Sequence, residues 1–194
     1  MKKDIIKKIA TEMFANKGYD KCSMQEIADA VGFNKASLYF YFKSKEQLYI
    51  CIFEDIINLY KSSVSNALHK NKSKPLYKIL LEIINSFVAA STNARLLLWK
   101  KANLMCLSNP ADELRQTLRD IYEHFNTDIY NKLTVLISEK SGLPPDHIDW
   151  FIKSYYIFTQ SFLEWMLINE SRDKQDVSQM LIKMWDCFWN GNKI

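Results

Sequence analysis

Glycine, proline, cysteine and histidine are scarce in this chain of 194 residues, which has four glycines, four prolines, four cysteines and three histidines. With few helix breakers, apolar residues recur at helical rather than alternating spacing almost throughout. Cys22, Cys51, Cys106 and Cys187 lie far apart with no Cys-x-x-Cys pair, which argues against a disulfide framework and a zinc site. We therefore expect an all-α protein of a reducing compartment, the cytoplasm.

Long hydrophobic runs are also missing. The most apolar stretch, residues 79–90, is interrupted by Glu82 and Asn85 and is shorter than the roughly 20 residues that span a bilayer. Near the start of the chain, Asp4 and Lys7 break any apolar core of a signal peptide. The scattered histidines and the absence of a Gly-rich phosphate loop argue against a metal or nucleotide site. We expect no membrane partner, no cofactor, no metal and no enzymatic activity.

The net charge of +4 is too small to indicate a nucleic-acid partner by itself, so its distribution matters more than its size. Nine lysines and six carboxylates lie within residues 1–46, so this segment holds most of the positive surplus. A mildly basic segment is also typical of an ordinary solvated surface. The pattern of residues must therefore distinguish the two interpretations.

Three short helices are predicted in this basic segment. The first, about 4–16, has one apolar stripe and a basic polar face. Ser23 and Glu26 have the spacing of a capping box, which opens a second helix that ends at Gly32. Asn34 is a good N-cap for the third helix. Two helices joined by a tight turn with a glycine indicate a helix-turn-helix unit.

Such a unit places its third helix in the major groove of DNA, where side chains contact base edges and phosphates. Leu38 and Phe42 are expected to face the core, whereas Phe40 is left unassigned. The alternative is that residues 39–42 are all core aromatics, but four adjacent aromatics on a short helix cannot all face inward. The candidate DNA-binding residues are Ser23, Met24, Asn34, Lys35, Ser37, Tyr39, Tyr41 and Lys45.

The rest of the chain predicts longer helices, at about 45–69, 75–91 and 93–107, from the Asn109-Pro110 signal to 141, and at about 147–169 and 176–189. The last two helices are apolar around much of their circumference, so they can pack on the domain and on a second copy. The alternative is that both apolar faces belong to the core of one monomer. The candidate dimer-interface residues are Phe151, Tyr155, Phe162, Met180, Met184 and Phe188.

Residues 9–48 resemble the N-terminal domain of TetR-family regulators. The resemblance depends on a dense set of residues: Ala10, Phe14, Gly18, Tyr19, Ile27, Ala28, Gly32, Leu38, Tyr39, Phe42, Lys45 and Leu48. It places the family's operator contacts on Lys35, Ser37, Tyr39, Tyr41 and Lys45. The sequence departs from the commonest family pattern at Phe40 and Tyr41, which affects base preference, and at Phe33, which affects packing.

The resemblance covers about a quarter of the chain and implies the organisation of the whole. It implies about nine helices, with a helix-turn-helix DNA-binding domain in residues 1–46 and an effector-binding and dimerisation domain in residues 47–194. The implied function is a repressor that binds a palindromic, double-stranded DNA operator as a homodimer. A small-molecule effector of unknown identity, largely apolar or aromatic, is expected to release the operator.

The implied effector pocket has no ligand-specific motif, but aromatic residues are abundant in this part of the chain. A carboxylate beside these rings, such as Glu82, Asp128 or Glu164, would suit a lipophilic cation. The alternative is that most of the rings are ordinary core residues. The candidate pocket residues are Glu82, Trp99, Tyr122, Phe125, Tyr155, Phe158, Phe162 and Trp165.

Two other functions use the same fold. One is a ligand-independent architectural or protein-binding DNA factor, which a filled core would favour over an aromatic cavity. The other is a redox sensor based on Cys22, the only cysteine near the expected DNA surface. A buried and unreactive thiol is the simpler interpretation of Cys22.

Overall fold

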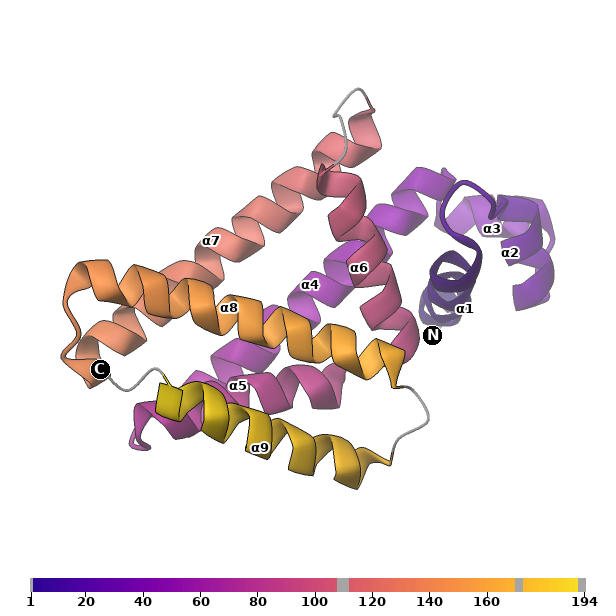
Figure 1. Ribbon diagram of the computed structural model, residues 1–194. Coiled ribbons are helices and arrows are strands. Elements are labelled where there is room, and N and C mark those ends of the chain that lie inside the picture. The colour runs from indigo at the N-terminus through magenta and orange to yellow at the C-terminus, as the bar shows by residue number, and fades with distance from the viewer. Residues whose placement is uncertain (1, 108–111, 170–172, 192–194) are drawn as a thin grey trace. The chain divides into compact units, whose positions relative to one another are not determined.

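The computed structural model describes residues 2–107, 112–169 and 173–191 (Figure 1). These residues form α-helices connected by turns and contain no strand, which confirms the predicted all-α class. The Asn109-Pro110 helix-start signal lies outside the described residues. The helices are α1 (Lys2–Lys17), α2 (Met24–Val31), α3 (Lys35–Tyr41), α4 (Lys45–Lys70), α5 (Leu76–Ala90), α6 (Asn93–Leu107), α7 (Glu113–Ser141), α8 (Pro145–Ile168) and α9 (Lys174–Gly191).

The chain divides into two compact units. Unit 1 comprises residues 1–58 and 92–124, and unit 2 comprises residues 59–91 and 125–194. The long helices α4 and α7 each contribute one part to unit 1 and the other part to unit 2. Unit 1 therefore extends well beyond residue 46, because α6 and the first turns of α7 belong to it.

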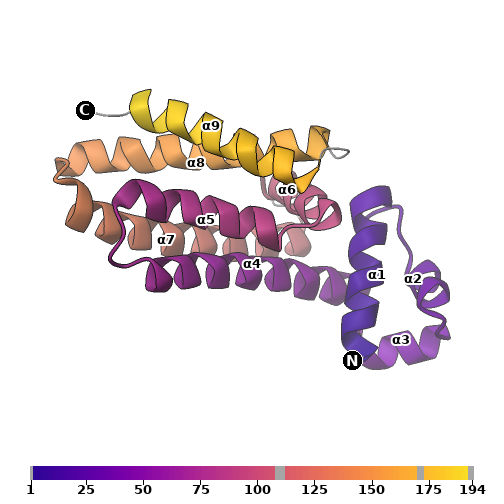
Figure 2. The ribbon, with the colours of Figure 1, turned by 90° about the horizontal axis from the view of Figure 1, so that it is seen from below.

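Unit 1 is built around α1, which packs against α2 and α6. Figure 2 shows α1, α2 and α3 grouped together. Ile6, Phe14 and Leu38 are buried in its core, and burying each such side chain stabilises the fold by about 1.5–3 kcal/mol. Polar contacts also tie α1 to its neighbours: Lys7 forms an ion pair with Asp55 of α4.

Unit 2 has a core that is unusually rich in aromatic rings. Trp185 of α9 is fully buried there, and its ring meets those of Tyr155 and Phe158 of α8 at centroid distances of 5.9 and 5.7 Å. The Tyr155 hydroxyl donates a hydrogen bond to the Leu80 carbonyl of α5 at 2.8 Å. Burial raises the pKa of Tyr155, so this phenol stays a hydrogen-bond donor. In both ribbon views α8 and α9 lie side by side.

Candidate nucleic-acid interface

The start of α2 is held by the predicted capping box. The Glu26 amide donates to Ser23 Oγ at 3.2 Å, and the Ser23 amide donates to Glu26 Oε2 at 2.8 Å. Lys17 Nζ donates to Glu26 Oε1 at 2.8 Å. The Lys17 ammonium and the two Ser23 donors lower the pKa of Glu26 to about 2. The capping box thus fixes the start of α2 with a carboxylate that is charged at neutral pH.

These contacts define what Ser23 and Met24 can offer to DNA. The Ser23 hydroxyl donates to Glu26 Oε2 at 2.9 Å, so it already has a partner within the chain. The Met24 side chain is only 6% exposed and belongs to the core. Contacts of these two residues with DNA remain a prediction, and for Met24 they would involve the backbone rather than the side chain.

The turn between α2 and α3 depends on the backbone of one glycine. Gly32 has φ +77° and ψ 29°, a left-handed conformation that glycine adopts without a steric penalty. The amides of Gly32 and Phe33 donate to the Asp29 and Ala28 carbonyls at 3.1 and 2.8 Å, which closes the end of α2. Asn34 Oδ1 then accepts the Ser37 amide at 2.7 Å and caps α3. The predicted helix-turn-helix connection is therefore present.

The seven residues of α3 form rows of side chains spaced four residues apart. Leu38 and Phe42, which follows the helix, are buried with exposed fractions of 0% and 3%, so both predicted core positions are confirmed. Two other rows are exposed, Lys35 with Tyr39 and Ala36 with Phe40, whereas Ser37 and Tyr41 are half-buried. The exposed and half-buried side chains of α3 thus supply one cation, three hydroxyl groups and three aromatic rings.

The two lysines proposed to contact DNA have different surroundings. Lys35 is exposed, and its Nζ lies 6.0 Å from the centre of the Tyr39 ring. Lys45 Nζ donates to the Tyr19 carbonyl at 2.9 Å and lies 4.2 Å from the centre of the Tyr19 ring. An ammonium group has three donors, so Lys45 retains the capacity to bind a phosphate. Its contact with DNA stays a prediction. Its contacts with Tyr19 give it a structural role as well, which the sequence did not indicate.

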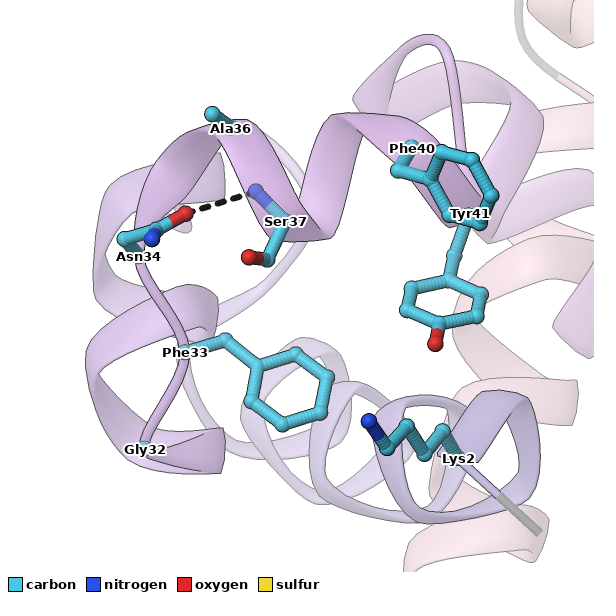
Figure 3. A pocket seen from close by; sticks show the side chains of 8 residues that line it. All are labelled: Lys2, Gly32, Phe33, Asn34, Ala36, Ser37, Phe40 and Tyr41. Atoms are coloured by element: carbon cyan, nitrogen blue, oxygen red, sulfur yellow. Dashed lines mark hydrogen bonds between the residues drawn. The ribbon is translucent and has the colours of Figure 1, made fainter.

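A surface hollow of about 600 Å³ lies between the N-terminal end of α1, the turn and α3. Figure 3 shows Phe33, Phe40, Tyr41 and Lys2 around it. Phe33 and Phe40 were not among the predicted DNA contacts, and Phe40 is 73% exposed. Phe40 lies four residues after Ala36, on a different face of the helix from Leu38. This spacing is the sequence signal that could have predicted an exposed Phe40.

The candidate effector-pocket residues do not all belong to one unit. Trp99 and Tyr122 are in unit 1, with ring centres 5.5 Å apart, whereas the other candidates are in unit 2. Glu82 is exposed on α5, and its place beside an apolar pocket stays a prediction. Tyr155, Phe158, Phe162 and Trp165 belong to or pack against the core cluster of unit 2. A pocket lined by these rings and by Phe125 stays a prediction.

The candidate dimer residues need a similar correction. Phe151, Tyr155 and Phe162 are buried within one chain, so their side chains cannot form an exposed interface. Helical periodicity identified the apolar faces of α8 but not which of them the remaining helices cover. Met180, Met184 and Phe188 of α9 are half-buried. The large apolar side chains exposed on these helices are instead Trp150, Tyr156, Ile157 and Ile168 of α8 and Ile182 of α9.

The described residues also bear on membrane, metal and thiol sites. Within residues 2–107, 112–169 and 173–191, no helix combines the length and apolar character that crossing a membrane requires. The same residues hold no cluster of three or more histidine, cysteine or carboxylate side chains placed to bind a metal ion. Cys22 is buried, and burial raises the pKa of its thiol, which disfavours the reactive thiolate.

Known proteins share both the interface region and the fold. Residues 6–51 match the family described as bacterial regulatory proteins, tetR family. The negative transcriptional regulator IcaR of the biofilm operon icaADBC of Staphylococcus aureus is 36% identical over 90 residues, which cover 42% of this chain and 45% of IcaR. The chain thus spans less than half the length of the curated relatives it matches.

Solved structures extend the likeness to nearly the whole chain. The ketosteroid transcriptional regulator KstR2 of Mycobacterium tuberculosis superposes with a TM-score of 0.73 at 15% identity, over 98% of this chain and 94% of that one. A transcriptional regulator from Saccharomonospora viridis in complex with choline gives a TM-score of 0.70 at 14% identity, over 95% of each chain. At these identities the likeness shows a shared fold.

Proposed function

Because the chain belongs to the TetR family of bacterial regulatory proteins, we propose that it is a sequence-specific repressor which a small apolar or aromatic ligand releases from a palindromic operator. The observation that carries this proposal is the outward-facing surface of α3, capped by Asn34 and oriented by the Gly32 turn. The name of IcaR, a negative transcriptional regulator, supports repression.

The exposed and half-buried side chains of α3 supply the chemistry that DNA recognition needs. Lys35 suits a guanine edge or a phosphate, and Ser37 suits either a base or a phosphate. The hydroxyls of Tyr39 and Tyr41 suit phosphates, while their rings suit thymine methyl groups. The exposed lysines Lys2, Lys3 and Lys35 all lie in this part of unit 1 and add attraction for the phosphate backbone.

A homodimer would present two copies of α3 to the two halves of a palindrome, about 34–36 Å apart along the DNA. The exposed apolar side chains of α8 and α9, including Trp150, Ile157 and Ile182, support an interface on these helices. Large apolar groups that one chain leaves uncovered are a typical feature of an association surface. We therefore move the proposed interface from the buried faces of α8 to its exposed face.

Ligand control is supported by the fold, because the regulator of similar fold from Saccharomonospora viridis was solved with choline. A ligand that binds more tightly to the conformation with low DNA affinity would weaken operator binding through a coupling of about 1–3 kcal/mol.

The proposal is tested by comparing two tyrosines of matched exposure. Tyr39 of α3 and Tyr130 of α7 have exposed fractions of 36% and 38%. Tyr39→Ala should weaken selective DNA binding by about tenfold or more in a gel-shift assay, whereas Tyr130→Ala should leave it unchanged. Equal binding by both variants and the wild-type protein would contradict the placement of the interface. Selective binding that no compound of an aromatic and cationic panel releases would favour the ligand-independent architectural factor.

A further inference from the structure

Phe40 is the most exposed aromatic residue of the helix-turn-helix unit. Its side chain is 73% exposed, and it lies on a helix of only seven residues. Exposing a large apolar side chain forgoes the stabilisation that its burial would supply. A side chain so placed is available to a partner that approaches the outer surface of α3.

The hollow beside Phe40 combines aromatic rings with polar groups. The rings of Phe33 and Tyr41 are stacked with centroids 6.2 Å apart and planes inclined by 29°. The edge of the Phe40 ring meets Tyr41 at 5.2 Å and 89°. Ala36, one turn before Phe40, leaves space at the wall of the hollow. In Figure 3 the rings of Phe33 and Tyr41 point toward Lys2 of α1.

The polar side-chain groups at the hollow come from Lys2, Asn34, Ser37 and Tyr41, and their positions limit what can bind there. Asn34 Oδ1 already accepts the Ser37 amide, so this oxygen serves the cap of α3. Lys2 Nζ lies 5.9 Å from the centre of the Phe33 ring, which puts a positive charge at the α1 side of the hollow. The occupant should therefore be an apolar group that is attached to an anion.

We propose that this hollow binds the 5-methyl group of an operator thymine, with Phe40 as the residue that determines this base preference. The inference rests on the proposed DNA-binding function and deepens it. Of the groups that bases present in the major groove, the thymine methyl is the apolar one, and phenylalanine is among the side chains that contact it. Phe33 and Tyr41 position the Phe40 ring, and Lys2 binds a neighbouring phosphate.

The other bases fit this surface poorly for a physical reason. Guanine, adenine and cytosine present only hydrogen-bonding groups in the major groove, whereas thymine presents a methyl group beside its O4 acceptor. Against the Ala36 and Phe40 side chains, these groups would lose water without gaining a partner. The row that contains Lys35 and Tyr39 offers polar partners instead. Neighbouring rows of α3 thus select for different bases.

The test combines protein variants with modified DNA. Duplexes that the full-length wild-type protein binds are selected from a random-sequence library, and each thymine is then replaced by uracil, which lacks only the methyl group. The affinity of the wild-type protein and of Phe40→Ala is measured for every duplex. Ile5→Ala is the control, because Ile5 is also exposed in unit 1 but does not line the hollow.

We expect uracil at one or two positions of each half-site to weaken wild-type binding by about fourfold, the effect of removing one buried methyl group. The same replacement should leave DNA binding by Phe40→Ala unchanged. It should weaken DNA binding by Ile5→Ala as much as it weakens wild-type binding. Because Phe40 is exposed, Phe40→Ala should melt within about 2 °C of the wild-type protein, and circular dichroism checks this.

The possible failures are distinguishable. If the wild-type protein binds selected duplexes and no uracil replacement weakens binding, the inference is wrong and the proposed function stands. If uracil weakens DNA binding by Phe40→Ala as much as by the wild-type protein, another residue contacts the methyl group and the proposed role of Phe40 is wrong. If no duplex is selected from the library, the proposed DNA-binding function itself fails.

Discussion

Lys35 and Lys45 carry the same charge near α3 but should contribute to different properties. Lys35 is exposed, so Lys35→Ala should change the free energy of unfolding by less than about 0.5 kcal/mol. Loss of one phosphate contact should reduce the salt dependence of DNA binding by about one unit of slope. Lys45 bonds to the Tyr19 carbonyl and lies over its ring, so Lys45→Ala should cost about 1–2 kcal/mol. Urea denaturation and salt-titrated binding measure these effects, and equal stability of the two variants would contradict the structural role of Lys45.

Glu26 should make the stability of the fold dependent on pH in the acid range. Its pKa is lowered to about 2 by Lys17 and Ser23, whereas an unfolded glutamate titrates near about 4.3. Because the pKa is lower in the folded state, the stabilisation is complete above the unfolded value and is lost as the pH falls through the folded value. Glu26→Gln should therefore melt below the wild-type protein at neutral pH.

The melting difference should begin to narrow below a pH of about 4.3 and should vanish near the folded pKa of about 2. Thermal melts of both proteins by circular dichroism, from neutral pH down to the acid limit of folding, would show this trend. A difference that stays constant across the acid range would mean that the carboxylate charge is not responsible.

At the scale of elements, the orientation of α3 depends on the Gly32 turn. A Cβ at Gly32 would meet no atom within 4 Å, so the penalty of Gly32→Ala comes from the left-handed φ of +77° alone. This penalty is about 1–2 kcal/mol, and Gly32→Asn should cost less because asparagine tolerates this conformation better. Gly191→Ala, at a glycine without a positive φ and with open space, is the control. Equal urea midpoints for Gly32→Ala and Gly191→Ala would contradict the requirement for glycine.

The sequence predicted the helices well because their signals are local. The capping box of Ser23 and Glu26, the Asn34 cap and the Gly32 turn each depend on residues within a few positions of one another. The side-chain positions of Leu38 and Phe42 followed from the same short-range periodicity. The roles of Lys45 and Phe40 could not be predicted in this way. The first depends on Tyr19, 26 residues away, and the second on the positions of α1 and the turn.

The same limit applies to the longer helices. Phe151, Tyr155 and Phe162 are as apolar as an interface requires, but contacts with α5 and α9 bury them within one chain. Periodicity shows that a helix has an apolar face, and only tertiary packing shows which part stays uncovered. For the same reason, the sequence could not show that α6 packs against α1 within unit 1.

At the scale of the whole molecule, assembly should depend on the exposed face of α8. Ile157 is 64% exposed there, so Ile157→Asp should fold normally yet weaken the dimer by about tenfold or more, because the interface would bury an unpaired carboxylate. Ile5→Asp, at an exposed isoleucine of α1, should leave the dimer unchanged. Analytical ultracentrifugation over a range of protein concentrations measures both. A dimer that persists unchanged in Ile157→Asp would exclude this face as the interface.

The central claim is selective DNA binding by α3, and its most direct test is binding of the purified protein to the intergenic DNA upstream of its own gene. The measurement is a gel shift against competitor DNA of unrelated sequence, titrated with salt and repeated with Tyr39→Ala. We predict that selective binding survives the competitor, weakens with salt and is weaker by about tenfold or more in Tyr39→Ala. Binding that the unrelated competitor removes as readily as the specific DNA, with Tyr39→Ala equal to the wild-type protein, would contradict the account.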